Sequence, residues 1–312
     1  MNIYFIGIND NILQSQNNFC GSITVVRNFD TKNNICFKDL HTNEKINYNN
    51  LDDLKRIDKF FIEAVKIILE KDHDAYFMRY NEHNLKGYNL KKYHILSAND
   101  YSLYNYVNNK FKIREALKEH TNILKYEYIK GFKAKKYLTN RWKKENCDFV
   151  LQEKYGFAGA NTYIFTKSNY KQQLKKLKCF TTYCVSILQK NFLPVNIHLF
   201  IQNGHVEYFK PSQQIINTDN SQMNYNGALF NLSETLENQI KSEAKKIGGI
   251  LLDIGYQGVL GIDFILTNNI LYFMEINARF QGSTTKLNEI LLKNRKRSLF
   301  DKQLKLLTKN LN

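Results

Sequence analysis

The sequence predicts a protein of mixed α and β structure, folded as two compact units that share an interface. At 312 residues the chain is longer than one small core requires. Short apolar runs typical of strands alternate with segments in which apolar residues recur every three or four positions, as in amphipathic helices. Hydrophobic residues make up 43% of the chain, with only 14 Gly and 2 Pro, which excludes collagen-like and disordered proteins.

The first 95 residues have a β-α-β pattern. The apolar run at residues 3–8 predicts a buried strand, and the spacing of apolar residues over 54–68 predicts an amphipathic helix. Residues 75–80 and 93–96 predict two further short strands. The turn after the first strand is not a GxGxxG fingerprint, so we predict no dinucleotide site there.

The rest of the chain continues the alternation. A helix is predicted over residues 110–120, and a second begins at Ser233, a good N-cap residue. A basic helix is predicted from residue 287 onward. The predicted strands of this part are 126–129, 148–153, 162–166, 194–198, 259–266 and 271–280.

Charge, cysteines and hydropathy narrow the class of protein. The net charge of +16 is weak evidence for a nucleic-acid partner when it stands alone, so we do not expect one. A basic site for a phosphorylated ligand is the better interpretation of this charge. Five cysteines without a CxxC pair indicate reduced thiols. No apolar run approaches the roughly 20 residues that span a bilayer, and the first residues lack signal-peptide features, so we expect a cytoplasmic protein with no membrane partner.

The two strands near residue 265 carry the clearest chemistry. Glu275, Asn277 and Arg279 stand two apart and therefore point to one face of a strand, whereas residues 274, 276 and 278 point to the other. A three-residue loop at 268–270 would pair residue 266 with residue 272 and place Asp263 opposite Glu275. A two-residue Asn-Asn turn would instead turn Asp263 away, so the spacing alone leaves the register open.

Two facing carboxylates imply a cation between them. At the roughly 5 Å that separates opposite Cβ atoms, like charges are destabilising without one. Oxygen ligands from Asp263, Glu275 and Asn277 favour Mg²⁺ or Mn²⁺ and leave coordination positions for phosphate and water. Arg279 is suited to holding a phosphate or a carboxylate. The alternative interpretation is an ordinary solvated hairpin.

These residues resemble a known family. Residues 258–265 (GVLGIDFI) and 272–282 (YFMEINARFQG) are similar to the C-terminal signature of ATP-grasp enzymes, the superfamily of biotin carboxylase and D-alanine:D-alanine ligase. The resemblance covers roughly residues 95–290. It implies an ATP-grasp domain over 96–312, with a small glycine-loop subdomain at about 125–187, preceded by a Rossmann-like domain over 1–95.

The resemblance also implies roles for residues upstream. Lys110 is similar to a lysine directed at the nucleotide phosphates, and residues 185–188, ending at Leu188, resemble the hinge whose backbone binds adenine. Gln152 stands where a second phosphate-binding lysine is usual, so it can donate a hydrogen bond but adds no charge. The nucleotide-covering loop corresponds to Gly156, Gly159 and Thr162 and is poorer in glycine than in well-known members.

The implied function is an ATP-dependent carboxylate-amine ligase that uses ATP and Mg²⁺ (or Mn²⁺) and forms an amide or peptide bond through an acylphosphate. Asp263, Glu275 and Asn277 would hold the metal, and Arg279 with Glu275 would act in catalysis. The substrates would be a small carboxylate and an amine, such as an amino acid or peptide, contacted from residues 211–230. The alternatives are an ATP-binding module without catalysis and a phosphotransferase of the same fold. The sequence leaves the specific substrates and a homo-oligomer open.

Overall fold

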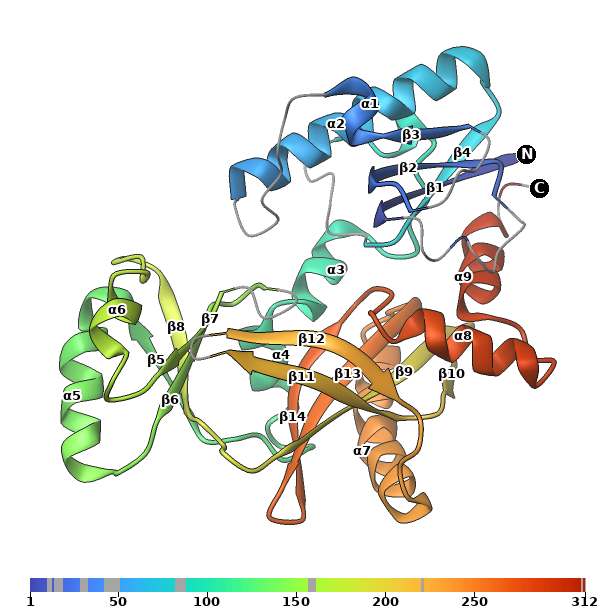
Figure 1. The fold of residues 1–312 in the computed structure, drawn as a ribbon. Helices are drawn as coiled ribbons and strands as arrows, with labels where there is room; N and C mark the ends of the chain where they lie inside the picture. Colours follow the sequence, from blue (N-terminus) through green and yellow to red (C-terminus); the bar gives the residue numbers. More distant parts are fainter. Residues whose placement is uncertain are drawn as a thin grey trace.

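The fold is described from a computed structural model, which defines residues 1–9, 13, 19–28, 33–41, 51–81, 88–156, 161–219, 222–309 and 311. Three β-sheets lie along the chain in the order of the sequence, each with its own helices (Figure 1). Together with the helices between and beside them, they give the mixed α and β structure that the sequence predicts.

The N-terminal sheet is parallel, with strand order β3-β2-β1-β4. Its strands are β1 (Asn2–Asn9), β2 (Gly21–Val26), β3 (Asn34–Cys36) and β4 (Ala75–Arg79), and its helices are α1 (Phe37–Leu40) and α2 (Leu51–Lys71). The strand predicted at 93–96 is wrong. Lys91–Tyr93 form a 3₁₀ turn, η2, and His94 has a left-handed φ of 51°, so extended structure is interrupted and only Ile95 forms a parallel bridge to Phe77.

Two short helices lead from this sheet to the rest of the chain. They are α3 (Tyr101–Val107) and α4 (Lys110–Leu117). The Asp100 carboxylate accepts from the N–H of Leu103, and the Asn109 side chain accepts from the N–H groups of Phe111 and Lys112. These caps fix the first residue of each helix, and the cap at Asn109 therefore fixes the position of Lys110.

The small sheet is antiparallel, with strand order β5-β8-β6-β7. Its strands are β5 (Tyr126–Lys130), β6 (Phe149–Gln152), β7 (Thr162–Phe165) and β8 (Thr182–Ile187). A 3₁₀ turn, η3 (Gly131–Lys133), leads into α5 (Ala134–Lys144), and α6 (Tyr170–Leu174) follows β7. Both helices lie on the outer side of the sheet, away from the central sheet (Figure 1).

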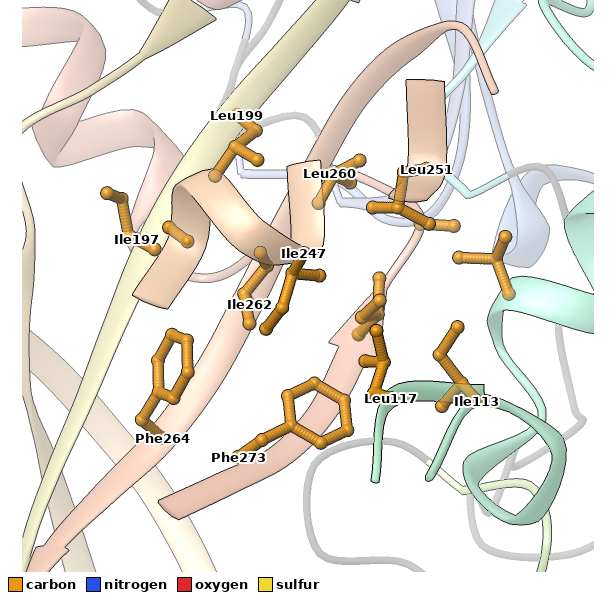
Figure 2. Close-up of a cluster of buried hydrophobic side chains, with 14 of the residues drawn as sticks. Ile113, Leu117, Ile197, Leu199, Ile247, Leu251, Leu260, Ile262, Phe264 and Phe273 are labelled. Carbon is orange, nitrogen blue, oxygen red and sulfur yellow. The ribbon is translucent and has the colours of Figure 1, made fainter. Parts of the chain in front are cut away.

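The central sheet has the order β12-β11-β9-β13-β14, with β10 paired to β9. Its strands are β9 (Leu193–Gln202), β10 (His205–Tyr208), β11 (Ser212–Asp219), β12 (Gln222–Leu229), β13 (Gly258–Thr267) and β14 (Ile270–Asn277). Helices α4 and α7 (Glu234–Asp253) cover one face. Figure 2 shows the resulting core, in which Ile113 and Leu117 of α4 and Ile247 of α7 meet Ile262 and Phe273 of the sheet. The opposite face is left for the site described below.

The C-terminal segment forms two helices, α8 (Thr284–Lys293) and α9 (Leu299–Thr308), where a single basic helix was predicted. The break follows from Arg295, which has a left-handed φ of 55°, and from Ser298, whose hydroxyl caps α9. Phe280 and Phe300 pack with Phe5 and Met78 of the N-terminal sheet, so this segment joins the first sheet to the third. No helix in the described part of the chain is both long and apolar enough to cross a membrane.

Candidate active site

The hairpin of β13 and β14 brings the two predicted carboxylates together. Of the two turns that the sequence left open, the structure has the two-residue one: Asn268 and Asn269 have left-handed φ values of 50° and 60°, and Leu266 pairs with Leu271 rather than with residue 272. A β-bulge then shifts the register by one residue, and Asp263 lies directly opposite Glu275. The predicted pairing is therefore confirmed, although the geometry that produces it differs.

The extra residue of the bulge is Met274. It lines the pocket beside Glu275, whereas the alternation predicted it on the opposite face; Ile276 and Ala278 do lie in the core, as predicted. The bulge carbonyl of Met274 accepts from Arg114 Nη2 at 3.1 Å, so the interruption of the strand ladder leaves no orphaned oxygen here. Strand β14 ends at Asn277, three residues before the predicted end.

A lysine and an asparagine side chain lie against the carboxylate pair. Lys110 Nζ, at the start of α4, is 2.5 Å from Glu275 Oε2. Asn277 Nδ2 donates to Asp263 Oδ2 at 2.8 Å and to Glu275 Oε1 at 3.3 Å, while Asn277 Oδ1 accepts from Arg279 Nη2 at 3.1 Å. Four of the predicted site residues thus form one hydrogen-bonded cluster with Lys110.

The two carboxyls differ in acidity because their neighbours differ. Burial, together with the negative charge of Glu275, raises the pKa of Asp263 to about 7. Burial also opposes ionisation of Glu275, but the Lys110 ammonium, the hydrogen bond from Asn277 and the charge of Arg279 together hold the pKa of Glu275 below its ordinary value. Lys110 and Arg279 both favour ionisation of the pair, yet the pKa of Asp263 stays raised, so a further cation beside the two carboxylates would stabilise their ionised forms.

Two glutamines hold Asp263 in place. Gln214 Nε2 and Gln281 Nε2 both donate to Asp263 Oδ1, at 3.1 and 3.0 Å. Gln281 Oε1 in turn accepts from the buried Asn196. Gly261 makes room for this contact, because a Cβ there would lie 1.9 Å from Gln281 Oε1.

Gln152 has a cationic partner that the sequence analysis did not find. Its Oε1 accepts from Arg114 Nη2 at 2.7 Å, and Arg114 Nη1 donates to Cys184 Sγ at 3.1 Å. Arg114 is only 5% exposed and forms no ion pair with a described carboxylate. Position 152 itself carries no charge, but the Arg114 guanidinium that contacts Gln152 places a positive charge directly beside it.

The cluster closes one end of a pocket between the small sheet and the central sheet, with a cavity of about 330 Å³. Lys110, Asp263, Glu275 and Arg279 make the polar end. The remainder is largely apolar: Leu124, Val150, Ile187, Leu188, Phe192, Pro194, Ile216 and Ile265. Such a division suits a ligand with one flat apolar part and one strongly anionic part.

The other predicted nucleotide-binding residues lie at or near this pocket. Gln152 and Thr162 line it, and Gln152 Nε2 is 3.5 Å from Thr162 Oγ1. Gly156 follows β6 outside the lining, and Gly159 falls outside the described residues. The N–H of Leu188 donates to the Asp148 carbonyl, so this amide is not available to a purine.

The donor set fits a hard divalent cation. No group of three or more His, Cys, Asp or Glu side chains that could hold a metal occurs in the ranges the structure covers, so a metal here would depend on two carboxylates and one amide. Carboxylate and amide oxygens are the ligands that Mg²⁺ and Mn²⁺ prefer, and a small protein ligand set leaves positions for phosphate. Because Asn277 now presents its nitrogen to the carboxylates, its amide would have to turn over to become a ligand.

Comparison with protein families identifies the fold. The profile described as the ATP-grasp domain matches residues 107–283, more than half of the chain. The protein belongs to the ATP-grasp family. The family predicted from the hairpin motifs is confirmed, and the match begins just before Lys110 and ends just after Gln281. No curated protein matches the chain.

Solved structures of ATP-grasp enzymes share the fold at low identity. Biotin carboxylase from Campylobacter jejuni has a TM-score of 0.66 at 13% identity, over 98% of this chain and 70% of that one. N5-carboxyaminoimidazole synthetase from Staphylococcus aureus, complexed with ADP, has a TM-score of 0.59 at 15% identity, over 98% and 76%. D-alanyl-alanine synthetase A from Vibrio cholerae has a TM-score of 0.55 at 15% identity, over 76% of each chain.

Sequence reasoning assigned no role to Gln214, Gln281 or Arg114. Gln281 lies inside the motif at residues 272–282. The glycines of the neighbouring strand, which leave room for a side chain, were the sequence feature that could have indicated its role. Gln214 belongs to the segment expected to contact substrate, where Ile216 and Tyr225 also line the pocket. Arg114 follows Lys110 by one helical turn, a spacing that puts both cations on one face of α4.

Proposed function

We propose that the protein is an ATP-dependent carboxylate-amine ligase. The observation that supports this most directly is the facing pair Asp263 and Glu275, with Lys110 beside it, at the polar end of a pocket whose other end is apolar. The family and the fold support ATP as the ligand, and ADP and ATP complexes of fold relatives are known.

The pocket chemistry suggests how ATP would be oriented. The apolar end, lined by Ile187 and Leu188, suits the purine, and the polar end suits the triphosphate. Lys110 would exchange its contact with Glu275 for phosphate oxygens, and Arg279 would supply a second cation. Arg114, held behind Gln152, would contribute positive potential without touching the phosphates.

Asp263, Glu275 and Asn277 would hold Mg²⁺ or Mn²⁺, which would neutralise triphosphate charge when bound. The contribution of this chain is to keep these ligands fixed. Gln214 and Gln281 hold the Asp263 carboxylate from one side, and the bulge at Met274 keeps Glu275 on the pocket face. The roles of Gln214 and Gln281 can be tested apart from metal binding, because neither glutamine is proposed as a metal ligand.

The reaction would proceed in two displacements. A substrate carboxylate oxygen would attack the γ-phosphorus and displace ADP, which gives an acylphosphate. An amine nitrogen would then attack the acyl carbon, phosphate would leave, and a proton lost from nitrogen would complete the amide. Arg279 would stabilise the oxyanion of this second step. No nucleophilic side chain is needed, and burial raises the pKa of the one cysteine near the site, Cys184, which keeps it a thiol.

The test is release of ADP from ATP with pooled carboxylic acids and amino acids. Turnover that requires both an acid and an amine supports ligation. Turnover with a single acceptor would indicate a phosphotransferase, and nucleotide binding without turnover would indicate a binding module. We also propose that the reaction takes place in the cytoplasm, where ATP and amino acids are available.

Two variants make the test specific. Glu275→Gln should abolish turnover while the circular dichroism spectrum is retained. Glu289→Gln is the matched control, because that residue forms an exposed ion pair with Lys286 on α8, away from the pocket, and its loss should leave turnover unchanged. Full activity of Glu275→Gln would contradict the mechanism.

A further inference from the structure

The positive charge of the protein is concentrated in the small sheet and its helices. Residues 125–190 contain fifteen Lys and Arg but only four Asp and Glu, so about a fifth of the chain holds about two thirds of the net charge. A uniform lysine-rich composition would spread the excess evenly along the chain. All fourteen lysines of this segment are exposed, whereas its one arginine, Arg141, pairs with Glu127 and Glu145.

The same unit exposes two phenylalanines at its outer end. Phe132 in η3 is 58% exposed and Phe180, just before β8, is 86% exposed. Their ring centroids are 6.5 Å apart. Removing rings of this size from water is favourable by about 2 kcal/mol or more each, so their joint exposure indicates a surface that is covered in a complex.

The two turns that carry these rings are fastened together. Gly131 N donates to Thr181 O at 2.9 Å, and Phe132 N donates to Cys179 O at 3.0 Å. A Cβ on Gly131 would lie 2.2 Å from the Lys178 carbonyl oxygen, so the close approach requires glycine. The rings are therefore presented by a fixed double turn, which we call the aromatic tip (residues 131–133 and 178–181).

Lysines surround the aromatic tip. Lys130 Nζ donates to the Phe180 carbonyl, and Lys133 Nζ lies 5.7 Å from the Phe132 ring centroid. Lys135 and Lys136 add two exposed charges in the first turn of α5, where the helix dipole makes cations unfavourable unless an anion is near. The tip thus combines two exposed aromatic side chains with lysines that lie at it or in the adjoining first turn of α5.

We propose that the aromatic tip docks on an anionic phospholipid surface, with Phe132 and Phe180 inserted among the acyl chains and the lysines on the headgroups. Protruding aromatic rings beside lysines are the chemistry of interfacial membrane binding. Because such binding needs no spanning helix, this proposal replaces the expectation, drawn from the absence of a long apolar run, that the protein has no membrane partner. A single-stranded nucleic acid fits less well, because the two rings are inclined at 57° and cannot sandwich a base.

The position of the tip leaves the pocket free. Strand β8 runs from Thr182 at the tip to Ile187 in the pocket lining, so the two sites lie at opposite ends of one strand. Docking would therefore hold the protein at a membrane surface without occupying the ATP site. This inference does not depend on the proposed ligase activity.

The test is co-sedimentation of the full chain with vesicles of phosphatidylcholine, with and without about 30% phosphatidylserine. We expect binding only to the anionic vesicles, and a loss of about tenfold or more in the partition coefficient for the double variant Phe132→Ser, Phe180→Ser. Ile270→Ser is the control, because Ile270 is exposed to 41% on the β13–β14 hairpin, far along the chain from the tip.

A charge variant separates the two contributions. Lys133→Glu with Lys136→Glu should also reduce binding to anionic vesicles by about tenfold, whereas Lys293→Glu on α8 should not. Equal binding by the wild-type protein and the double phenylalanine variant would overturn the proposal. So would absence of binding to anionic vesicles, or preferential binding of a single-stranded oligonucleotide that depends on Phe180.

Discussion

Asp263 should lower the stability of the protein while serving its function, so Asp263→Asn should stabilise the protein at neutral pH. A pKa raised from 3.8 to about 7 corresponds to about 4 kcal/mol of destabilisation once the carboxyl is ionised in the folded state. The amide cannot accept from all three donors that Asp263 now serves, and the site is partly open to water. We therefore expect a net gain of about 2 kcal/mol in the free energy of unfolding.

The stability difference between Asp263→Asn and the wild type should depend on pH. Because the folded protein holds the Asp263 proton more tightly than the unfolded chain, the wild-type protein loses stability from this group as pH rises from about 4 to about 7. The variant has no such group. Between about pH 4 and about pH 8 the difference in the free energy of unfolding, measured by urea unfolding, should therefore shift in favour of the variant by up to about 4 kcal/mol, and at about pH 8 the variant should be about 2 kcal/mol more stable than the wild type.

Asp148→Asn is the control, since Asp148 forms an outer ion pair with Lys190 at 3.5 Å and should change stability by less than about 1 kcal/mol. If Asp263→Asn were no more stable than the wild type at about pH 8, or equally stabilised at both pH values, the strained carboxylate pair would be refuted. The variant should also lose ATP turnover, since stability and function compete at such a site.

Three further predictions concern the surroundings of the pair. Lys110→Met should destabilise the protein by about 3 kcal/mol at neutral pH and by less in acid, where Glu275 becomes protonated; urea unfolding at both pH values checks this. Gly261→Ala should displace Gln281 and weaken ATP binding measured by calorimetry at least about tenfold, and unchanged affinity would show that Gln281 is dispensable. Burial lowers the pKa of His198 to about 3, so this residue stays neutral in the folded protein but takes up a proton in the unfolded chain below about pH 6.5. The wild type therefore loses stability on acidification to about pH 4.5, and His198→Gln should lose less.

The sequence predicted β9, β13 and β14 of the central sheet and helix α7, because their patterns are local, but it predicted none of β10, β11 and β12. Residues 259–266 are apolar enough to read as a buried strand, and Ser233 is a favourable helix cap, as the structure bears out. The strand predicted at 93–96 failed because its apolar residues are equally compatible with a turn, and the left-handed His94 decides between them. Local composition does not encode that choice.

The site shows where local reasoning ends. Alternation alone placed Asp263 and Glu275 together only with the wrong loop length, because a bulge is a property of two strands and of the Arg114 side chain that binds its carbonyl. The partners Gln214 and Arg114 come from 49 and 160 residues away from the groups they contact. Such pairings depend on how the sheets pack, and a single sequence carries no direct signal for them.

The packing of the C-terminal helices α8 and α9 against the N-terminal sheet has a consequence for synthesis of the protein. Phe5 and Met78 leave the ribosome roughly 200 residues or more before the phenylalanines that cover them, Phe280 and Phe300. Until then one apolar face of the parallel sheet is exposed to solvent, and Figure 1 shows α9 next to the N-terminal sheet that it helps to cover. The nascent chain therefore exposes an apolar surface that chaperones can bind until α8 and α9 have emerged, and deletion of α9 should leave the N-terminal sheet prone to aggregation.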